Sequence, residues 1–276
     1  MIVSEALRAA AARLEPGNES PRLDAEVLLA HVLGWTRTLL LVAADDPVSD
    51  DHQRQFQALV EKREAREPIA YLTGVQEFWS LPLRVTPDVL IPRQETELLV
   101  ETVLDRLADR PAPRIADLGT GSGAVALALA SERSDAHIWA TDLQPAALDV
   151  ARANAEQLGL GDIRFVLGYW LQPLADQRFD AIVSNPPYIA DSDPHLDALI
   201  HEPRTALTAG SDGLRDLRAI VAAAPACLEP GGWLAVEHGW EQGAAVRELM
   251  RQSGLERVET HRDLGGMDRV STGQNQ

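Results

Sequence analysis

The sequence contains a single cysteine, Cys227, within the apolar run AIVAAAPACL. One cysteine cannot build a disulfide framework or a cysteine metal site within one chain. The seven histidines also lack a recognisable metal-ligand spacing with acids or with Cys227, so no metal site is expected. We therefore expect Cys227 to pack in a hydrophobic core.

Positive charge is scarce. The chain has 25 Lys and Arg against 42 Asp and Glu, which gives a formal net charge of −17. Proteins that wrap nucleic acid bind its phosphates through a broad basic face. The charge balance therefore disfavours a direct nucleic-acid partner.

Long hydrophobic runs are missing as well. No segment approaches the roughly 18 uninterrupted apolar residues of a membrane span. The N-terminus carries Glu5 and Glu15 and has no basic leader before an apolar stretch, which argues against a targeting signal. We expect a soluble, cytoplasmic protein with no membrane partner.

The chain is long enough for two domains, since it has 276 residues of which 45% are hydrophobic. Residues 1–74 predict a small helical domain, and its fourth helix is expected to follow Ser49 as N-cap and to stop before Pro68. Residues 75–92 are short extended runs separated by prolines, which predicts a β-hairpin connector. Residues 93–276 form the third segment.

In residues 93–276, short apolar strands alternate with helices, as in a doubly wound sheet. The predicted strands are 114–119, 137–142, 163–168, 179–185 and 233–238, and two final strands are expected within 255–273. The pattern predicts an α/β fold with a mostly parallel sheet.

A glycine-rich loop follows the first of these strands in RIADLGTGSGAVALALA. Glycines there allow a sharp turn and close approach of a ligand. The next strand ends in Asp142, which lies 23 residues after Gly119 and suits the two hydroxyls of a ribose. The candidate cofactor residues are Asp117, Gly119, Thr120, Gly121, Ser122, Gly123 and Asp142.

The spacing distinguishes between cofactors. Dinucleotide sites usually have G-x-G-x-x-G, with the pyrophosphate at the helix N-terminus. This loop has G-x-G-x-G, and Asp117 beside it would repel a pyrophosphate but suit the ammonium of a methionine moiety. The pattern therefore points to S-adenosyl-L-methionine.

Other residues have two interpretations each. Trp170 is either an aromatic face for adenine or a half-buried loop tryptophan. Arg93, Thr96 and Glu97 precede a helix. They either line the methionine end of the cofactor pocket or serve as helix-start residues.

A rigid corner follows the strand at 179–185, where the sequence reads SNPPYI. Pro186 and Pro187 fix their own φ angles and offer carbonyls without N–H groups. The Asn185 side-chain oxygen and the Pro186 carbonyl are suited to accept the two hydrogens of a planar NH₂ group, with the Tyr188 ring as a wall. This corner predicts a catalytic and substrate-binding site for a planar nitrogen.

Several motifs together resemble the release-factor glutamine methyltransferases, within the class I S-adenosylmethionine-dependent (Rossmann-like) methyltransferases. The motifs are REPIAYLTGVQEFWSLPLRVTPDVLIPRQETELLVE, DLGTGSGAVALALA, TDLQPAAL, VSNPPYI, EPRTALTAGSDGL and GGMDRVSTG. The stretch from Ile69 to Glu97 is the most specific, because N-P-P-Y alone also occurs in nucleic-acid amino-methyltransferases. The family usually has Pro at the position of Gln94 and an acid at that of Tyr169.

The resemblance implies an antiparallel C-terminal strand in the sheet. It also implies N5-methylation of the glutamine in the Gly-Gly-Gln motif of class-1 peptide chain release factors, which the N-terminal helices would recognise. By the same analogy Gly119 to Gly123, Asp142, Trp170 and Asn185 contact the cofactor, and Asn185 to Tyr188 hold the glutamine.

Three alternatives stay open on the sequence. The first is a methyltransferase for a ribosomal-protein glutamine. The second is a nucleic-acid amino-methyltransferase, which the acidic charge disfavours. The third is a binding module without turnover, which the intact corner from Asn185 to Tyr188 disfavours.

Overall fold

The computed structural model describes residues 1–276, which form two compact units, Met1–Val75 and Gln76–Gln276. Each unit has its own hydrophobic core. No helix is long and apolar enough to cross a lipid bilayer.

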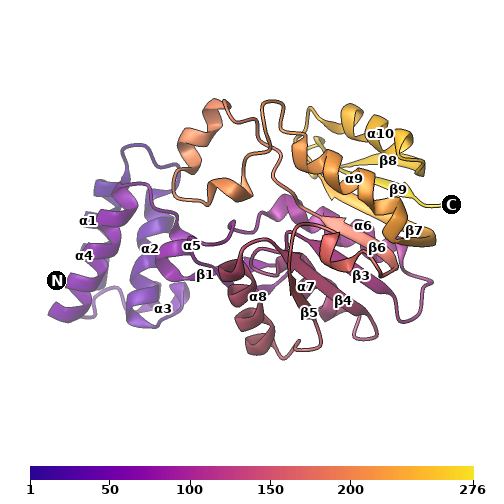
Figure 1. Cartoon of the computed structure of the whole chain (residues 1–276). Helices are drawn as coiled ribbons and strands as arrows, with labels where there is room; N and C mark the ends of the chain where they lie inside the picture. Colours follow the sequence, from indigo (N-terminus) through magenta and orange to yellow (C-terminus); the bar gives the residue numbers. More distant parts are fainter. The chain divides into compact units, whose positions relative to one another are not determined.

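The first unit is helical (Figure 1). As predicted, the Ser49 hydroxyl caps the fourth helix by accepting from the backbone N–H of His52 over 3.2 Å. A short fifth helix after Pro68 was not expected. The helices are α1 (Val3–Leu14), α2 (Pro21–Leu33), α3 (Arg37–Val42), α4 (Asp50–Glu64) and α5 (Ile69–Thr73).

The strands β1 (Val75–Phe78) and β2 (Leu81–Arg84) pair in a two-stranded sheet. Trp79 and Ser80 join them, and both have positive φ angles, which suits the tight turn of a hairpin. The Trp79 backbone N–H donates to the Glu97 carboxylate over 2.9 Å. Glu97 therefore anchors this turn.

The second unit contains a seven-stranded sheet in the order β5-β4-β3-β6-β7-β9-β8 (Figure 1). Strands β3 to β7 are parallel, and β9 runs antiparallel to both β7 and β8. The strands are β3 (Arg114–Leu118), β4 (His137–Asp142), β5 (Arg164–Leu167), β6 (Phe179–Ser184), β7 (Leu228–Glu237), β8 (Glu256–Arg262) and β9 (Asp268–Gln274). The expected α/β fold with a mostly parallel sheet and one antiparallel C-terminal strand is confirmed.

Helices cover both faces of this sheet. Successive residues of a strand point to opposite faces, so the apolar side chains on each face pack against their own set of helices. Ile115 of β3 packs in a core cluster with residues of α6, α7 and α8. Its neighbour Ala116 packs in another cluster with residues of α9 and α10, including Cys227. The helices are α6 (Glu97–Arg106), α7 (Ala124–Glu132), α8 (Pro145–Leu158), α9 (Arg215–Cys227) and α10 (Gly243–Gln252).

The chain changes direction across the sheet at β3. It passes from β3 outward through β4 to β5, and then returns to β6 on the other side of β3. Ligands of open α/β sheets bind beyond the carboxyl ends of the strands at such a switch. The glycine-rich loop after β3 and the corner after β6 therefore meet at the expected place for a site.

Candidate active site

A cavity of about 450 Å³ lies beyond the carboxyl ends of β3, β4, β5 and β6. This volume falls in the usual range for small-molecule sites. Of the residues predicted from the sequence, it is lined by Asp117, Gly119, Thr120, Gly121, Ser122, Asp142, Trp170, Asn185 and Pro187. Gly123, Pro186 and Tyr188 are not among the residues that line it.

The glycine-rich loop is fixed against β4. The backbone N–H groups of Gly119 and Thr120 both donate to the Thr141 carbonyl, over 2.8 and 2.9 Å. Gly119 has a φ of +71°, and a Cβ there would lie 2.8 Å from Cζ3 of Trp170. Glycine is required at this position because the Trp170 ring packs directly on the backbone.

Asp142 is held at the end of β4 by two backbone donors. Its carboxylate accepts from the N–H of Gly121 and from that of Gln144, each over 2.9 Å. Burial raises the pKa of Asp142, although these backbone bonds oppose the shift. The carboxylate is thus rigid, and it keeps further lone pairs for a ligand.

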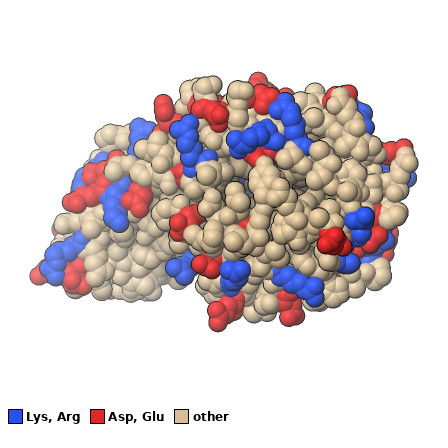
Figure 2. Space-filling view, in the orientation of Figure 1, with Lys and Arg blue, Asp and Glu red and all other residues tan.

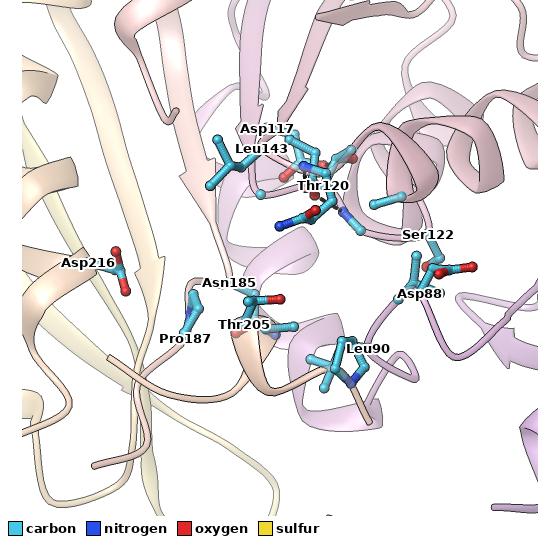
Figure 3. Close-up of a pocket in the computed structure, with 18 of the residues that line it drawn as sticks. Asp88, Leu90, Asp117, Thr120, Ser122, Leu143, Asn185, Pro187, Thr205 and Asp216 are labelled. Carbon is cyan, nitrogen blue, oxygen red and sulfur yellow. Dashed lines mark hydrogen bonds between the residues drawn. The ribbon is translucent and has the colours of Figure 1, made fainter. Parts of the chain in front are cut away.

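Asp117 is the second carboxyl group of the cavity, and its side chain is buried. It accepts a hydrogen bond of 2.6 Å from the Thr120 hydroxyl. Burial nevertheless raises the pKa of Asp117 to about 7, and the negative charge of Asp142 adds to the rise. In Figure 3, Asp117 and Thr120 lie together at one side of the pocket, away from Asn185 and Pro187.

These two acids fit a cationic, ribose-containing ligand. None of the groups that shift the pKa values of Asp117 and Asp142 is a cationic side chain. An ammonium or sulfonium group would stabilise the ionised form of Asp117, because an opposite charge lowers the pKa of a carboxyl group. The residues present therefore suit S-adenosylmethionine better than an anionic dinucleotide.

The corner after β6 is tied to its surroundings by side chains. The Ser184 hydroxyl donates to the Leu118 carbonyl over 2.7 Å, which joins the ends of β6 and β3. The Asn185 Nδ2 donates to the Thr96 hydroxyl oxygen over 3.0 Å. The Tyr188 hydroxyl donates to Glu237 over 3.2 Å. These bonds hold the corner rigidly at the pocket.

The loop after the corner contributes another wall, which includes Pro203, Arg204, Thr205 and Thr208. Glu202 fixes this loop to the segment before α6, because its carboxylate forms an ion pair with Arg93 and accepts from the Ile91 backbone N–H. Glu202 was not predicted from the sequence as a site residue. The only signal for it was its place in the motif EPRTALTAGSDGL.

The structure shows the contacts of the residues whose roles the sequence left open. Thr96 lines the cavity, whereas Arg93 pairs with Glu202 and Glu97 supports the hairpin turn. Tyr169 also lines the cavity, and its hydroxyl donates to Asp216 over 3.2 Å. A carboxylate is therefore present in this wall, although Tyr169 replaces the acid that the family pattern has.

Comparison with known families divides the chain in the same way as its structure. The PrmC N-terminal domain family matches residues 5–74, and the methyltransferase small domain family matches residues 94–253. A release factor glutamine methyltransferase of Salmonella typhimurium is 50% identical over 259 residues, which is 93% of both chains. The chain belongs to the release factor glutamine methyltransferase family.

Other relatives agree with this membership. The release factor glutamine methyltransferase of Escherichia coli is 48% identical over 270 residues, which is 97% of both chains. Among solved structures, the 16S rRNA N2 G1207 methyltransferase of T. thermophilus, in complex with AdoMet and guanosine, has 20% identity and a TM-score of 0.54 over 73% of this chain and 50% of that chain. This second likeness concerns the fold alone.

Proposed function

We propose that this protein uses S-adenosyl-L-methionine to methylate the side-chain nitrogen of the glutamine in the Gly-Gly-Gln motif of class-1 peptide chain release factors. The observation that carries the proposal is the adjacency of two features. A cavity with the acids Asp117 and Asp142 adjoins the acceptor-rich corner at Asn185. The family relatives, named as release factor glutamine methyltransferases, support the choice of substrate.

Each cofactor residue has a distinct task in this proposal. Asp142 accepts the ribose hydroxyls, Asp117 faces the positive charge of the methionine moiety, and Trp170 flanks the adenine. The loop residues Gly119 to Gly123 allow the ligand to approach the backbone. When bound, S-adenosylmethionine supplies an electrophilic methyl group on its sulfonium.

The corner orients the nucleophile. A carboxamide nitrogen is a weak nucleophile because its lone pair is delocalised into the carbonyl. We propose that the Asn185 Oδ1 and the Pro186 carbonyl each accept one N–H of the substrate glutamine, with Tyr188 beside its plane. The lone pair would then point at the methyl group that bound S-adenosylmethionine would supply; the C–S bond would break as the N–C bond forms, and the surplus N–H proton would pass to water.

This arrangement relies on position rather than on a strong base. Holding the two reacting atoms in line at about 3–3.5 Å supplies much of the rate enhancement of well-oriented reactions. The hydrogen bonds of Asn185 and Ser184 to neighbouring elements keep the corner in place. Turnover should therefore depend strongly on the Asn185 side chain.

The charge distribution on the face shown disfavours a nucleic-acid substrate. Figure 2 shows basic side chains in small groups, separated by acidic and uncharged surface, with no continuous basic face on this side of the molecule. Nucleic-acid binding depends on such a face. We further propose that the helices of Met1–Val75 contact the body of the release factor, since every residue that lines the cavity belongs to Gln76–Gln276.

The deciding experiment is to incubate the protein with S-adenosylmethionine and a class-1 release factor, and to locate any added methyl group by peptide mass spectrometry. We expect one methyl group on the glutamine of the Gly-Gly-Gln motif. A release factor with that glutamine changed to alanine serves as the matched control. Methylation of a ribosomal protein or of nucleic acid in parallel reactions, with none on the release factor, would replace the proposal by one of its alternatives.

A further inference from the structure

A buried carboxyl group lies behind the corner. Glu237 ends β7 and is 1% exposed. Because Val236 is opposite Ser184 in the pairing of β7 with β6, Glu237 lies beside the start of the corner. Its Oε1 accepts from the Tyr188 hydroxyl over 3.2 Å, whereas its Oε2 is buried and has no hydrogen-bond partner. Such a group is costly in a protein interior.

Thr96 connects this carboxyl group to Asn185. Its hydroxyl oxygen accepts from the Asn185 Nδ2 over 3.0 Å, and its hydroxyl group faces the Glu237 carboxyl group and lowers the pKa of that acid. A hydroxyl group has only one proton to donate. Since Asn185 already donates to Thr96, the Thr96 proton is free to point toward Glu237, whose Oε2 has no other partner. The Asn185 Oδ1 is then the end of the amide that stays available for another partner.

We propose that Glu237 is a positioning residue: its carboxylate accepts the hydroxyl protons of Thr96 and Tyr188, and so fixes which end of the Asn185 amide meets the substrate glutamine. This inference rests on the proposed function. Glu237 acts through its two hydroxyl partners.

The orientation matters because the two ends of an amide differ in chemistry. The Asn185 Oδ1 accepts an N–H, whereas the Asn185 Nδ2 only donates. A reversed amide would place one N–H donor against another and would remove an acceptor from the corner. A carboxylate only accepts hydrogen bonds, so it determines the direction of every bond in the chain from Glu237 through Thr96 to Asn185.

Protonation of Glu237 would release this constraint, since a carboxylic acid also donates. Burial raises the pKa of Glu237 to about 7. The Thr96 hydroxyl, the charge of Arg269 on β9 and the Tyr188 hydroxyl lower it, and Glu95 raises it. The required carboxylate is present above this pKa and is lost as the pH falls through it. Turnover at saturating cofactor should fall in the same direction.

Substitutions at Glu237 and Thr96 test the proposal through their effect on kcat. Glu237→Gln keeps the shape of the side chain but places a donor beside the hydroxyl groups, and Thr96→Val removes the connecting hydroxyl. We expect each to lower kcat by about 5- to 100-fold, the range for one unsatisfied buried hydrogen-bonding group. Glu237 does not line the cavity, so Glu237→Gln should keep cofactor affinity within about twofold of wild type. Glu237→Gln should also flatten the acidic fall of kcat. Thr96→Ser, which keeps the hydroxyl, should restore most of the turnover.

The matched control is Thr102→Val. Thr102 is another buried threonine, on α6, and its hydroxyl donates only to the Leu98 carbonyl, over 2.7 Å. This variant should retain the kcat and the pH profile of wild type. Urea unfolding followed by tryptophan fluorescence checks that every variant is folded.

A spectroscopic measurement is independent of turnover. The chain has four asparagines, Asn18, Asn154, Asn185 and Asn275, so isotope-labelled asparagine gives few side-chain amide signals in NMR, and Asn185→Ala assigns the relevant one. We expect the Asn185 signal to titrate with Glu237 near pH 7 and to lose this titration in Glu237→Gln.

The outcomes separate this inference from the proposed function. A wild-type protein that does not methylate the release factor contradicts the function itself, whereas the NMR titration still tests the contact. With an active wild type, a Glu237→Gln variant with unchanged kcat and unchanged pH profile overturns the inference. A Thr96→Ser variant as impaired as Thr96→Val also overturns it, because packing rather than the hydroxyl would then be responsible.

Discussion

The ring of Trp170 packs against the backbone of Gly119 so closely that a Cβ there would lie 2.8 Å from the ring. Gly119→Ala must therefore displace Trp170 and strain a left-handed backbone, at a cost of about 1–3 kcal/mol for the backbone alone. We expect the affinity for S-adenosylmethionine, measured by calorimetry, to fall by about tenfold or more. Gly159→Ala is the control, since its φ is +70° but its Cβ would meet nothing within 4 Å. Equal cofactor affinities in the two variants would exclude a role for the Trp170 contact.

Asp142→Ala should weaken cofactor binding by about 1–3 kcal/mol, the scale of hydrogen bonds to a charged group. The reason is the loss of the carboxylate that two backbone N–H groups hold at the end of β4. Calorimetry with S-adenosylhomocysteine measures the effect. Asp149→Ala, at an exposed position on α8, should bind like wild type. An unchanged affinity in Asp142→Ala would contradict the assignment to the ribose.

Cofactor affinity should depend on pH through Asp117, whose pKa burial raises to about 7. A raised carboxyl pKa means that the negative form is present above pH 7 and is lost as the pH falls through this value. A cationic ligand prefers the ionised form, so the dissociation constant should rise about tenfold from pH 8 to pH 6. Calorimetry in two buffers should detect proton release on binding at pH 6. The Asp117→Asn variant should bind weakly at both values, and a flat wild-type profile would exclude the predicted contact.

Asn185→Ala should remove most turnover and leave the fold intact, because the lost contact acts on the nucleophile. Loss of one oriented group at a reacting centre commonly costs about 10²–10³ in kcat. Methylation of the release factor under saturating conditions, together with urea unfolding, measures both quantities. Turnover close to wild type would rule out the mechanism.

Arg93→Ala should destabilise the second unit, because Glu202 would keep its buried carboxylate without a cationic partner. We expect a loss of about 1–3 kcal/mol, a value for a partly exposed pair below that of fully buried ones. Urea unfolding followed by tryptophan fluorescence measures it. The double variant with Glu202→Ala should lose less than the sum of the two single variants. Strict additivity would show that the pair is not coupled.

The sequence predicted those parts of the site that depend on local chemistry at strand ends. Gly119, Asp142 and Asn185 each lie at the carboxyl end of an apolar strand, and the doubly wound pattern alone places such strand ends at one edge of the sheet. The structure brings these residues to one cavity. Their roles as cofactor and substrate contacts remain predictions.

Contacts between elements that lie far apart in the sequence could not be predicted from it. The bonds of Thr96 and Glu237 to the corner join the segment before α6, the end of β6 and the end of β7. The only hint was the glutamate that directly follows the apolar run WLAV. Which side chain meets it depends on strand order and on side-chain packing, and neither can be read from the spacing of one sequence.

The position of β9 has a consequence for biosynthesis. This strand follows β8 in the sequence, yet it lies between β7 and β8. During translation β7 has no neighbour on that side until residues Asp268–Gln274 have left the ribosome. Nascent chains interrupted before this point would expose the apolar edge of β7 to other proteins, so we expect the final residues of the sheet to complete the domain in a late, cooperative step.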